Sequence, residues 1–236
     1  MNTLAFQIGA WVGGPGETPQ PTAENVQAFQ YLQGSHLDLI NHFALFDIND
    51  WDNVKQYADV AKANGDWYDW GVGKKDAGNT DANVAEAFRH IVNIFREESV
   101  TNVKWVWTTN ASNHGHGTTF TGNYPGDDYV DYISIDGYNW GKSQDWSNWQ
   151  TFTQVFKKSY DALSTINKPL FIAEISCSEK GGNKAEWITD MFEQFQTNFS
   201  RVFAVMWFSQ SKDYEGDWAL NTSQAAVDAW KAGIAK

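Results

Sequence analysis

Basic residues, cysteine and long apolar runs are all scarce in this sequence. Only 17 Lys and Arg stand against 29 Asp and Glu, which gives a net charge of −12 and leaves no basic stripe to bind a polyanion. Nucleic acid is therefore not expected as a partner. Every apolar stretch is also shorter than the roughly 20 residues that a membrane span needs, so no membrane partner is expected.

The other scarcities narrow the class of protein further. The single cysteine, Cys177, excludes an intrachain disulfide framework and is expected to be a packed thiol. No basic start followed by an apolar stretch opens the sequence, so no signal peptide is expected in this chain. Charged residues make up 19% and hydrophobic residues 42% of the chain, which excludes intrinsic disorder. We expect one domain that spans residues 1–236.

Aromatic residues are abundant instead. The chain has 13 Trp, 9 Tyr and 15 Phe, which together form 16% of its residues, and many lie beside Gly, Asn or Asp. Core packing accounts for part of them. The alternative for the others is a carbohydrate-binding cleft, because flat aromatic faces stack on the apolar faces of pyranose rings without needing charge.

Segments with strand-like and helix-like patterns alternate along most of the chain. Connections after the strands are long and rich in Trp, Asn, Asp and Gly, whereas connections after the helices are short. This asymmetry predicts an α/β fold of the TIM-type (β/α) barrel class, with its active site on the loops that follow the strands. Six strands are expected, at residues 4–12, 37–46, 103–109, 129–138, 170–176 and 201–208.

The alternation breaks once. Helices are expected at residues 51–62 and 81–98, and only an aromatic, glycine-punctuated segment at 66–73, interpreted as a loop, separates them. A complete barrel has eight strands. The sequence therefore predicts an incomplete barrel in which 37–46 and 103–109 are neighbours or open edges, and unpaired edges can pair with a second copy of the chain.

Glu174 is the strongest catalytic candidate, because it follows four apolar residues at the end of an expected strand. Carboxylates at strand ends in barrels are usually functional. The structural alternative is a buried ion pair with Lys180 or Arg201. Tyr138 ends another strand and could donate a hydrogen bond to a nearby carboxylate, whereas Asp136 on the same strand is expected to be structural.

Four tryptophans are candidates for substrate binding. Trp140 follows Tyr138 closely, and Trp207 ends the last strand, where it either floors a sugar subsite or plugs the barrel. Trp67 and Trp70 lie in the segment interpreted as a loop, where stacking on a ligand and packing on the barrel are equally reasonable.

No cofactor is expected. His114 and His116 flank a glycine in a polar loop, but no third His or Cys lies near them, so a metal site is not predicted. The glycine-rich residues 13–16 lack the spacing of a dinucleotide-binding turn and the Lys and Ser/Thr of a phosphate loop.

Several of these segments together resemble glycoside hydrolase family 26, over nearly the whole chain and in family order. Within that family the sequence is most similar to the endo-β-1,3-1,4-glucanases (lichenases), and next to the β-mannanases. The segments are IGAWVG (8–13), NGDWYDWG (64–71), FRHIVNIFR (88–96), TNVKWVW (101–107), YPGD (124–127), DGYNWG (136–141) and IAE (172–174).

The resemblance implies a (β/α)8 barrel and retaining hydrolysis by two glutamates. Glu174 matches the nucleophile, Tyr138 matches the tyrosine that hydrogen-bonds it, and Trp67 and Trp207 match sugar-stacking tryptophans. The implied partner is a β-glucan or β-mannan polysaccharide, and the natural parent of the chain is expected to be secreted.

One catalytic residue of the family pattern is missing. The general acid/base is a glutamate after a histidine, just before the NGDWY segment, but residues 60–65 here read VAKANG. The family's third and fourth strands are also absent, which agrees with the broken alternation. The resemblance thus implies an endo-β-glycanase on mixed-linkage β-glucan with impaired activity. The alternatives are an endo-β-1,4-mannanase, a non-catalytic β-glucan-binding protein and an inactive truncated barrel.

Overall fold

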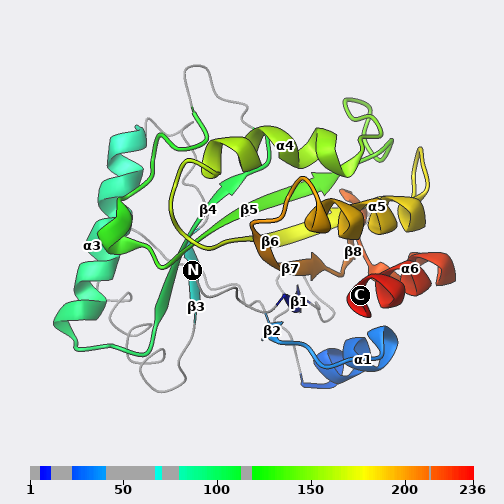
Figure 1. The fold of residues 1–236 in the computed structure, drawn as a ribbon, viewed down its shortest axis with the longest axis horizontal. Coiled ribbons are helices and arrows are strands. Elements are labelled where there is room, and N and C mark those ends of the chain that lie inside the picture. Colours follow the sequence, from blue (N-terminus) through cyan, green and yellow to red (C-terminus); the bar gives the residue numbers. More distant parts are fainter. Residues whose placement is uncertain (1–5, 12–22, 41–66, 71–79, 113–118, 213) are drawn as a thin grey trace.

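A computed structural model describes residues 6–11, 23–40, 67–70, 80–112, 119–212 and 214–236. Seven strands form one parallel sheet (Figure 1). They are β1 (Gln7–Trp11), β2 (Leu39–Ile40), β3 (Trp67–Trp70), β4 (Lys104–Asn110), β5 (Tyr132–Asn139), β6 (Leu170–Cys177) and β7 (Val202–Phe208). Two further strands, β8 (Ser211–Lys212) and β9 (Gly216–Asp217), form an antiparallel hairpin.

The order of the strands in the sheet is β2-β1-β7-β6-β5-β4-β3. Read from β3, the strands follow the chain to β7 and then continue with β1 and β2, so the first strand lies beside the last parallel one. This cyclic order is that of a barrel, and within the described residues it is interrupted only between β2 and β3. The fold is therefore a barrel of the TIM type that is incomplete, as the sequence predicts.

The strand count differs from the expectation at one segment. Residues Trp67–Trp70, interpreted from sequence as part of a loop, form β3, whose Trp67 is in register with Lys104 of β4. Aromatic residues favour strands, and the flanking glycines hid this tendency. Consequently β4 lies between β3 and β5 and is not an edge strand. The helix expected at 51–62 lies outside the described residues.

Five α-helices are described: α1 (Ala23–Gln33), α3 (Asp81–Glu97), α4 (Phe152–Leu163), α5 (Lys184–Gln196) and α6 (Gln224–Ile234). Two short 3-10 helices, η2 (Asp127–Tyr129) and η3 (Leu220–Thr222), complete the elements. None of the helices in the described residues is long and apolar enough to cross a membrane.

Four of the five described α-helices, α3 to α6, begin after a residue whose polar side chain accepts a hydrogen bond from the first turn. Thr80 caps α3, Asn183 caps α5 and Ser223 caps α6. At α4 the Thr151 and Gln154 side chains bond each other's backbone N–H groups, which is a capping box. These caps explain why the helices begin within one or two residues of polar positions.

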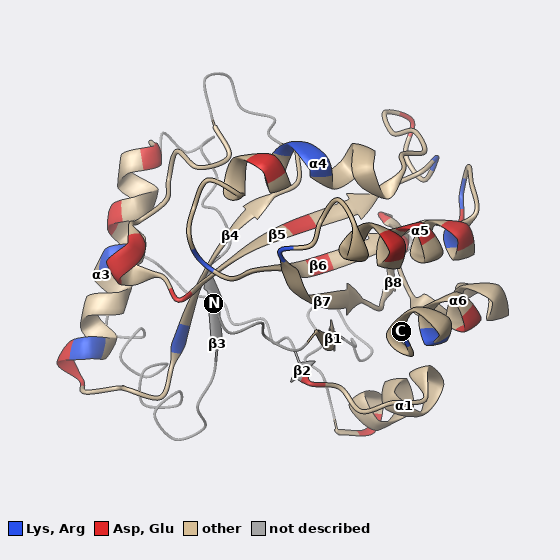
Figure 2. Ribbon diagram, in the orientation of Figure 1, with Lys and Arg blue, Asp and Glu red and all other residues tan. Residues whose placement is uncertain are grey.

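The core lies on both sides of the sheet. Between the sheet and the helices, a large cluster of buried side chains includes Phe152, Phe192 and Trp230. On the other side of the strands, a smaller cluster contains Val106, Phe171 and other apolar residues of β4, β6 and β7. The strands β5 and β6 are therefore held rigidly, and each carries a single acidic residue, which Figure 2 shows in red within the sheet.

Candidate active site

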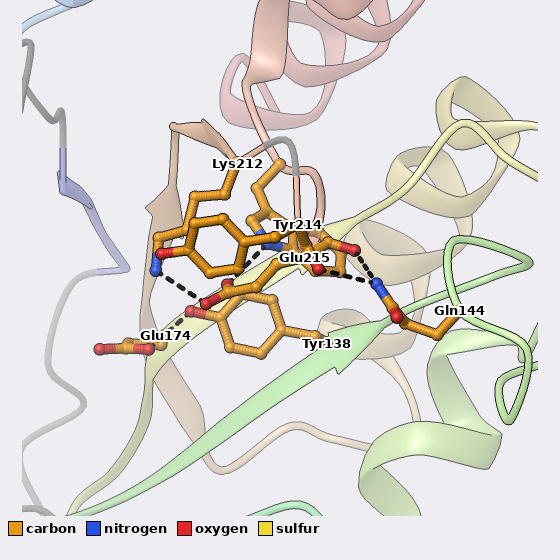
Figure 3. A network of polar contacts seen from close by, with 7 residues as sticks. Tyr138, Gln144, Glu174, Lys212, Tyr214 and Glu215 are labelled. Carbon is orange, nitrogen blue, oxygen red and sulfur yellow. Dashed lines mark hydrogen bonds and ion pairs between the residues drawn. The ribbon is translucent and has the colours of Figure 1, made fainter. Parts of the chain in front are cut away.

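Glu174 and Tyr138 meet near the carboxyl ends of two neighbouring strands. Asp136 of β5 is in register with Glu174 of β6, and Tyr138 lies two residues further along β5. Its hydroxyl group donates a hydrogen bond to Glu174 Oε2 at 2.6 Å (Figure 3). The carboxylate is thus oriented by a rigid phenol, while its second oxygen takes no part in this bond.

The surroundings of Glu174 act on its ionisation in opposite directions. Burial raises the pKa of Glu174 above its ordinary value, and the negative charge of Glu215 raises it further. The hydrogen bond from Tyr138 and the positive charge of Lys212 lower the pKa of Glu174. Burial and the charge of Glu174 also raise the pKa of Tyr138 well above its usual value, so Tyr138 stays protonated as a donor.

The charged groups come from the β8–β9 hairpin, which follows β7 directly. Lys212 Nζ lies 3.2 Å from Glu215 Oε1, and Trp218 Nε1 donates to Glu215 Oε2 at 3.4 Å. Figure 3 shows Lys212, Tyr214 and Glu215 together on one side of Tyr138. The sequence analysis did not single out Lys212, Tyr214, Glu215 or Trp218. Their position just after the last strand of a barrel was nevertheless a usable signal.

Aromatic rings surround Tyr138. Its ring centroid lies 5.1 Å from that of Trp218, 5.9 Å from that of Phe208 and 6.4 Å from that of Trp140. Trp140 is half-buried, and its ring packs edge-on against Trp218 at 4.9 Å. The structure therefore brings three of the predicted site residues, Glu174, Tyr138 and Trp140, into one region.

Trp207 is a correction to the sequence-based prediction. Its ring is completely buried, 5.3 Å from Trp230 of α6, and Lys184 Nζ of α5 lies 5.7 Å from the ring centroid. Trp207 Nε1 donates to the carbonyl oxygen of Trp218 at 3.0 Å. The residue belongs to the core between the sheet and the helices. Its ring is therefore not accessible to a sugar.

The other two predicted tryptophans, Trp67 and Trp70, are the first and last residues of β3. The structure describes only the backbone of these two residues. Because β3 is parallel to β4 and β5, its carboxyl end lies at the same edge of the sheet as those of β5 and β6. Stacking of these two side chains on a substrate stays a prediction.

The alternative of an ion pair between Glu174 and Arg201 does not fit. Arg201 Nη2 donates to the carbonyl oxygens of Ile166 and Lys168, both at 2.8 Å, which precede β6. Lys180 follows β6 in the connection to α5. The cation that acts on Glu174 is Lys212, which belongs to the site itself.

Within the described part of the chain, no three His, Cys, Asp or Glu side chains cluster as metal ligands would. His114 and His116 lie outside that part. Cys177 is buried, its thiol donates to the Ser178 carbonyl oxygen, and burial raises its pKa, all of which fit the packed thiol that the sequence predicts.

Comparison of the sequence and the fold with known proteins shows the family of this chain. The sequence model described as "Glycosyl hydrolase family 26" matches residues 56–233. Endoglucanase H of Acetivibrio thermocellus is 39% identical over 280 residues, which cover 97% of this chain and 30% of that protein. This alignment is longer than the 236-residue chain, so the relative carries segments that have no counterpart here.

Two other relatives are mannanases. Mannan endo-1,4-beta-mannosidase of Bifidobacterium adolescentis is 29% identical over 146 residues, which cover 60% of this chain and 14% of that protein. A solved structure of a Bacillus subtilis mannanase has a TM-score of 0.61 at 10% identity and covers 98% of this chain and 86% of its own. The chain thus spans less than a third of the length of the two curated relatives it matches, and it belongs to glycosyl hydrolase family 26.

Proposed function

We propose that this chain is a retaining endo-β-glycanase that cleaves mixed-linkage β-1,3-1,4-glucan with Glu174 as its nucleophile. The observation that carries the proposal is the 2.6 Å hydrogen bond from Tyr138 to Glu174 at the carboxyl ends of two neighbouring strands. The endoglucanase name of its 39% identical relative favours a glucan over a mannan, although that relative is more than three times longer.

The geometry suits a nucleophilic carboxylate. Tyr138 binds Oε2 of Glu174, so we assign the attack on the anomeric carbon to Oε1. A bond then forms between Oε1 and that carbon, the bond to the leaving oxygen breaks, and its electron pair stays on the leaving oxygen. Attack requires the ionised form of Glu174, which the Tyr138 hydrogen bond and the Lys212 charge favour against the effect of burial.

The second part of the proposal is that the activity is impaired. A retaining glycosidase needs a second carboxyl group, about 5–5.5 Å from the first, to protonate the leaving oxygen and later activate water. The family's His-Glu pair has no equivalent at residues 60–65. Loss of a general acid costs typically about 10²- to 10⁴-fold in rate. Glucan hydrolysis should suffer this loss, since its leaving sugar hydroxyl needs a proton.

The test compares substrates that need the acid with one that does not. The dinitrophenolate group of a dinitrophenyl β-glycoside departs without protonation. We therefore expect a covalent glycosyl adduct on Glu174 that intact-protein mass spectrometry detects, with slow release because no base activates water. Lichenan should be cut far more slowly. Glu174→Ala is the control and should form no adduct.

Two results would contradict parts of this proposal. Rapid lichenan hydrolysis by the unchanged chain would show that another carboxyl group, with Asp66 and Asp69 examined first, serves as acid/base. Absence of any adduct would leave the non-catalytic glucan-binding protein or the inactive barrel as the function.

Mannan is the second candidate substrate, because a curated relative and a structural neighbour are both named as mannanases. Reducing-end release from lichenan and from β-mannan, measured side by side at high protein concentration, separates the two. Faster release from β-mannan would replace the glucan assignment and leave the role of Glu174 intact.

A further inference from the structure

Two solvent-exposed aromatic side chains lie on the segments that build the candidate active site. Among the described residues, the large hydrophobic side chains with high exposure are Phe6, Tyr31, Trp146 and Tyr214. Trp146 is 68% exposed and Tyr214 is 74% exposed. Trp146 belongs to the connection between β5 and α4, and Tyr214 to the connection between β8 and β9. Neither is needed for the core.

Trp146 is the outer end of a row of rings that begins at the carboxylate. The Tyr138 hydroxyl group contacts Glu174, and the Tyr138 ring contacts Trp218 at 5.1 Å between centroids. Trp218 contacts Trp140 at 4.9 Å, and Trp140 contacts Trp146 at 5.1 Å. The row therefore runs outward from the half-buried carboxylate to a largely exposed indole.

Hydrogen bonds join the two segments that carry the exposed rings. Gln144 Nε2 donates to the carbonyl oxygens of Tyr214 at 3.1 Å and Glu215 at 2.7 Å, which joins the β5–α4 connection to the β8–β9 hairpin (Figure 3). The same connection is closed internally, since Ser147 Oγ and the Gln144 backbone exchange hydrogen bonds. Ser143 Oγ also donates to the Trp140 carbonyl oxygen at 2.6 Å.

We propose that Trp146 and Tyr214 form a sugar-binding platform for pyranose rings that lie beyond the one at Glu174. The inference rests on the proposed function. Exposed indole and phenol rings leave apolar surface in water, and beside a functional site such surface is available to stack on a ligand. A neutral glycan suits it, because its sugar faces stack on aromatic rings and its hydroxyl groups reach the polar atoms around them.

The platform makes binding depend on the length of the substrate. A disaccharide is held at the Glu174 end of the row, whereas a hexasaccharide of mixed-linkage β-glucan is long enough to reach Trp146 as well. Removal of one stacking ring should weaken only the longer ligand, by about 3- to 10-fold, the effect of one aromatic contact.

The experiment is calorimetric titration of Glu174→Gln protein, which cannot cut the ligand, with a mixed-linkage disaccharide and hexasaccharide. We expect Trp146→Ala to weaken hexasaccharide binding by about 3- to 10-fold and to leave disaccharide binding unchanged. The matched control is Tyr31→Ala, since Tyr31 is 89% exposed but lies on α1, away from this site (Figure 1). It should bind both ligands as the parent does.

A second measurement needs no substitution at the platform. Hydroxyl-radical footprinting of the Glu174→Gln protein should show that the hexasaccharide lowers oxidation of Trp146 and Tyr214 and leaves Tyr31 unaffected. Unchanged hexasaccharide affinity in Trp146→Ala, with unchanged oxidation of both rings, overturns the platform while the proposed function stands. Absence of binding by every ligand overturns both.

Discussion

A single hydrogen bond, from Tyr138 to Glu174, brings together the two groups on which the proposed chemistry depends. The pKa of the carboxyl group is raised by burial, whereas the phenol keeps its proton because its own pKa is raised well above its usual value. The phenol therefore acts as a permanent donor, and the ionised state of Glu174 is set by its neighbours. Substitutions of those neighbours should move the activity along the pH axis in opposite directions.

Tyr138→Phe should make Glu174 harder to ionise. The hydrogen bond lowers the pKa of Glu174, so its removal raises that pKa, and the nucleophile becomes available only at higher pH. We expect the acidic limb of kcat/KM with dinitrophenyl glycoside to shift to higher pH and the plateau to fall about 10-fold or more, the effect of one hydrogen bond to a charged group. An unshifted limb would mean that the bond does not control ionisation.

Glu215→Gln should have the opposite effect. The charge of Glu215 raises the pKa of Glu174, and its removal also frees Lys212 from its ion pair. Both changes favour ionised Glu174, so the acidic limb of the same pH profile should move to lower pH. The amide can still accept a hydrogen bond from Trp218, which makes this the least disruptive substitution at that position. A shift to higher pH would contradict the assigned electrostatics.

At the scale of the elements, one buried lysine connects α5 to the segment that contains β9 and η3. Lys184 Nζ donates to the carbonyl oxygens of Asp217 at 3.0 Å and Ala219 at 2.7 Å, and to Thr222 Oγ1 at 3.1 Å. Burial lowers the pKa of Lys184 from 10.5 to about 8. The first residue of a helix thus fixes the segment from which Trp218 reaches the active site.

The depressed pKa of Lys184 makes the stability of the fold depend on pH. Between about pH 8 and 10.5 the unfolded chain binds more protons at this residue than the folded one, so raising the pH through that window stabilises the fold. Lys184→Met should remove this increase. It should also lower the free energy of unfolding at pH 7.5 by about 1–3 kcal/mol, because buried carbonyl groups lose their donor.

Urea unfolding of the parent and of Lys184→Met at pH 7.5 and pH 9.5 tests this, since all other titrating groups are common to both proteins. The gap between the parent and the variant should widen at the higher pH. A gap that stays constant would show that Lys184 titrates near its ordinary value.

The elements also show what the sequence could predict. Glu174 was predictable because it follows an apolar stretch on a strand, and Tyr138 because it lies near the end of another strand; position along a strand determines the edge of the sheet at which a side chain lies. The β8–β9 hairpin was not predictable from the sequence, because each of its strands has two residues and two residues show no periodicity. Trp207 was misplaced because every residue of β7 is buried, so alternation gives no facing direction.

At the scale of the whole molecule, the interrupted barrel has two edge strands in the described part of the chain, β2 and β3. Edge strands with unpaired backbone groups invite pairing with another chain. We therefore expect the protein to associate, and light scattering behind size-exclusion chromatography should give a mass above the 26.7 kDa of one chain. A concentration-independent mass of one chain would show that both edges are protected within the monomer.

The cyclic strand order has a further consequence, which concerns how the chain folds. Strands β4 to β7 pair with their neighbours in sequence, whereas Ile8 of β1 pairs with Val205 of β7, and Gln33 accepts a hydrogen bond from Trp230, 197 residues away. Contacts this distant carry a large loop-closure entropy and form slowly. We therefore expect the C-terminal strands and helices to assemble first, with β1 and the helix α1 packing against them last.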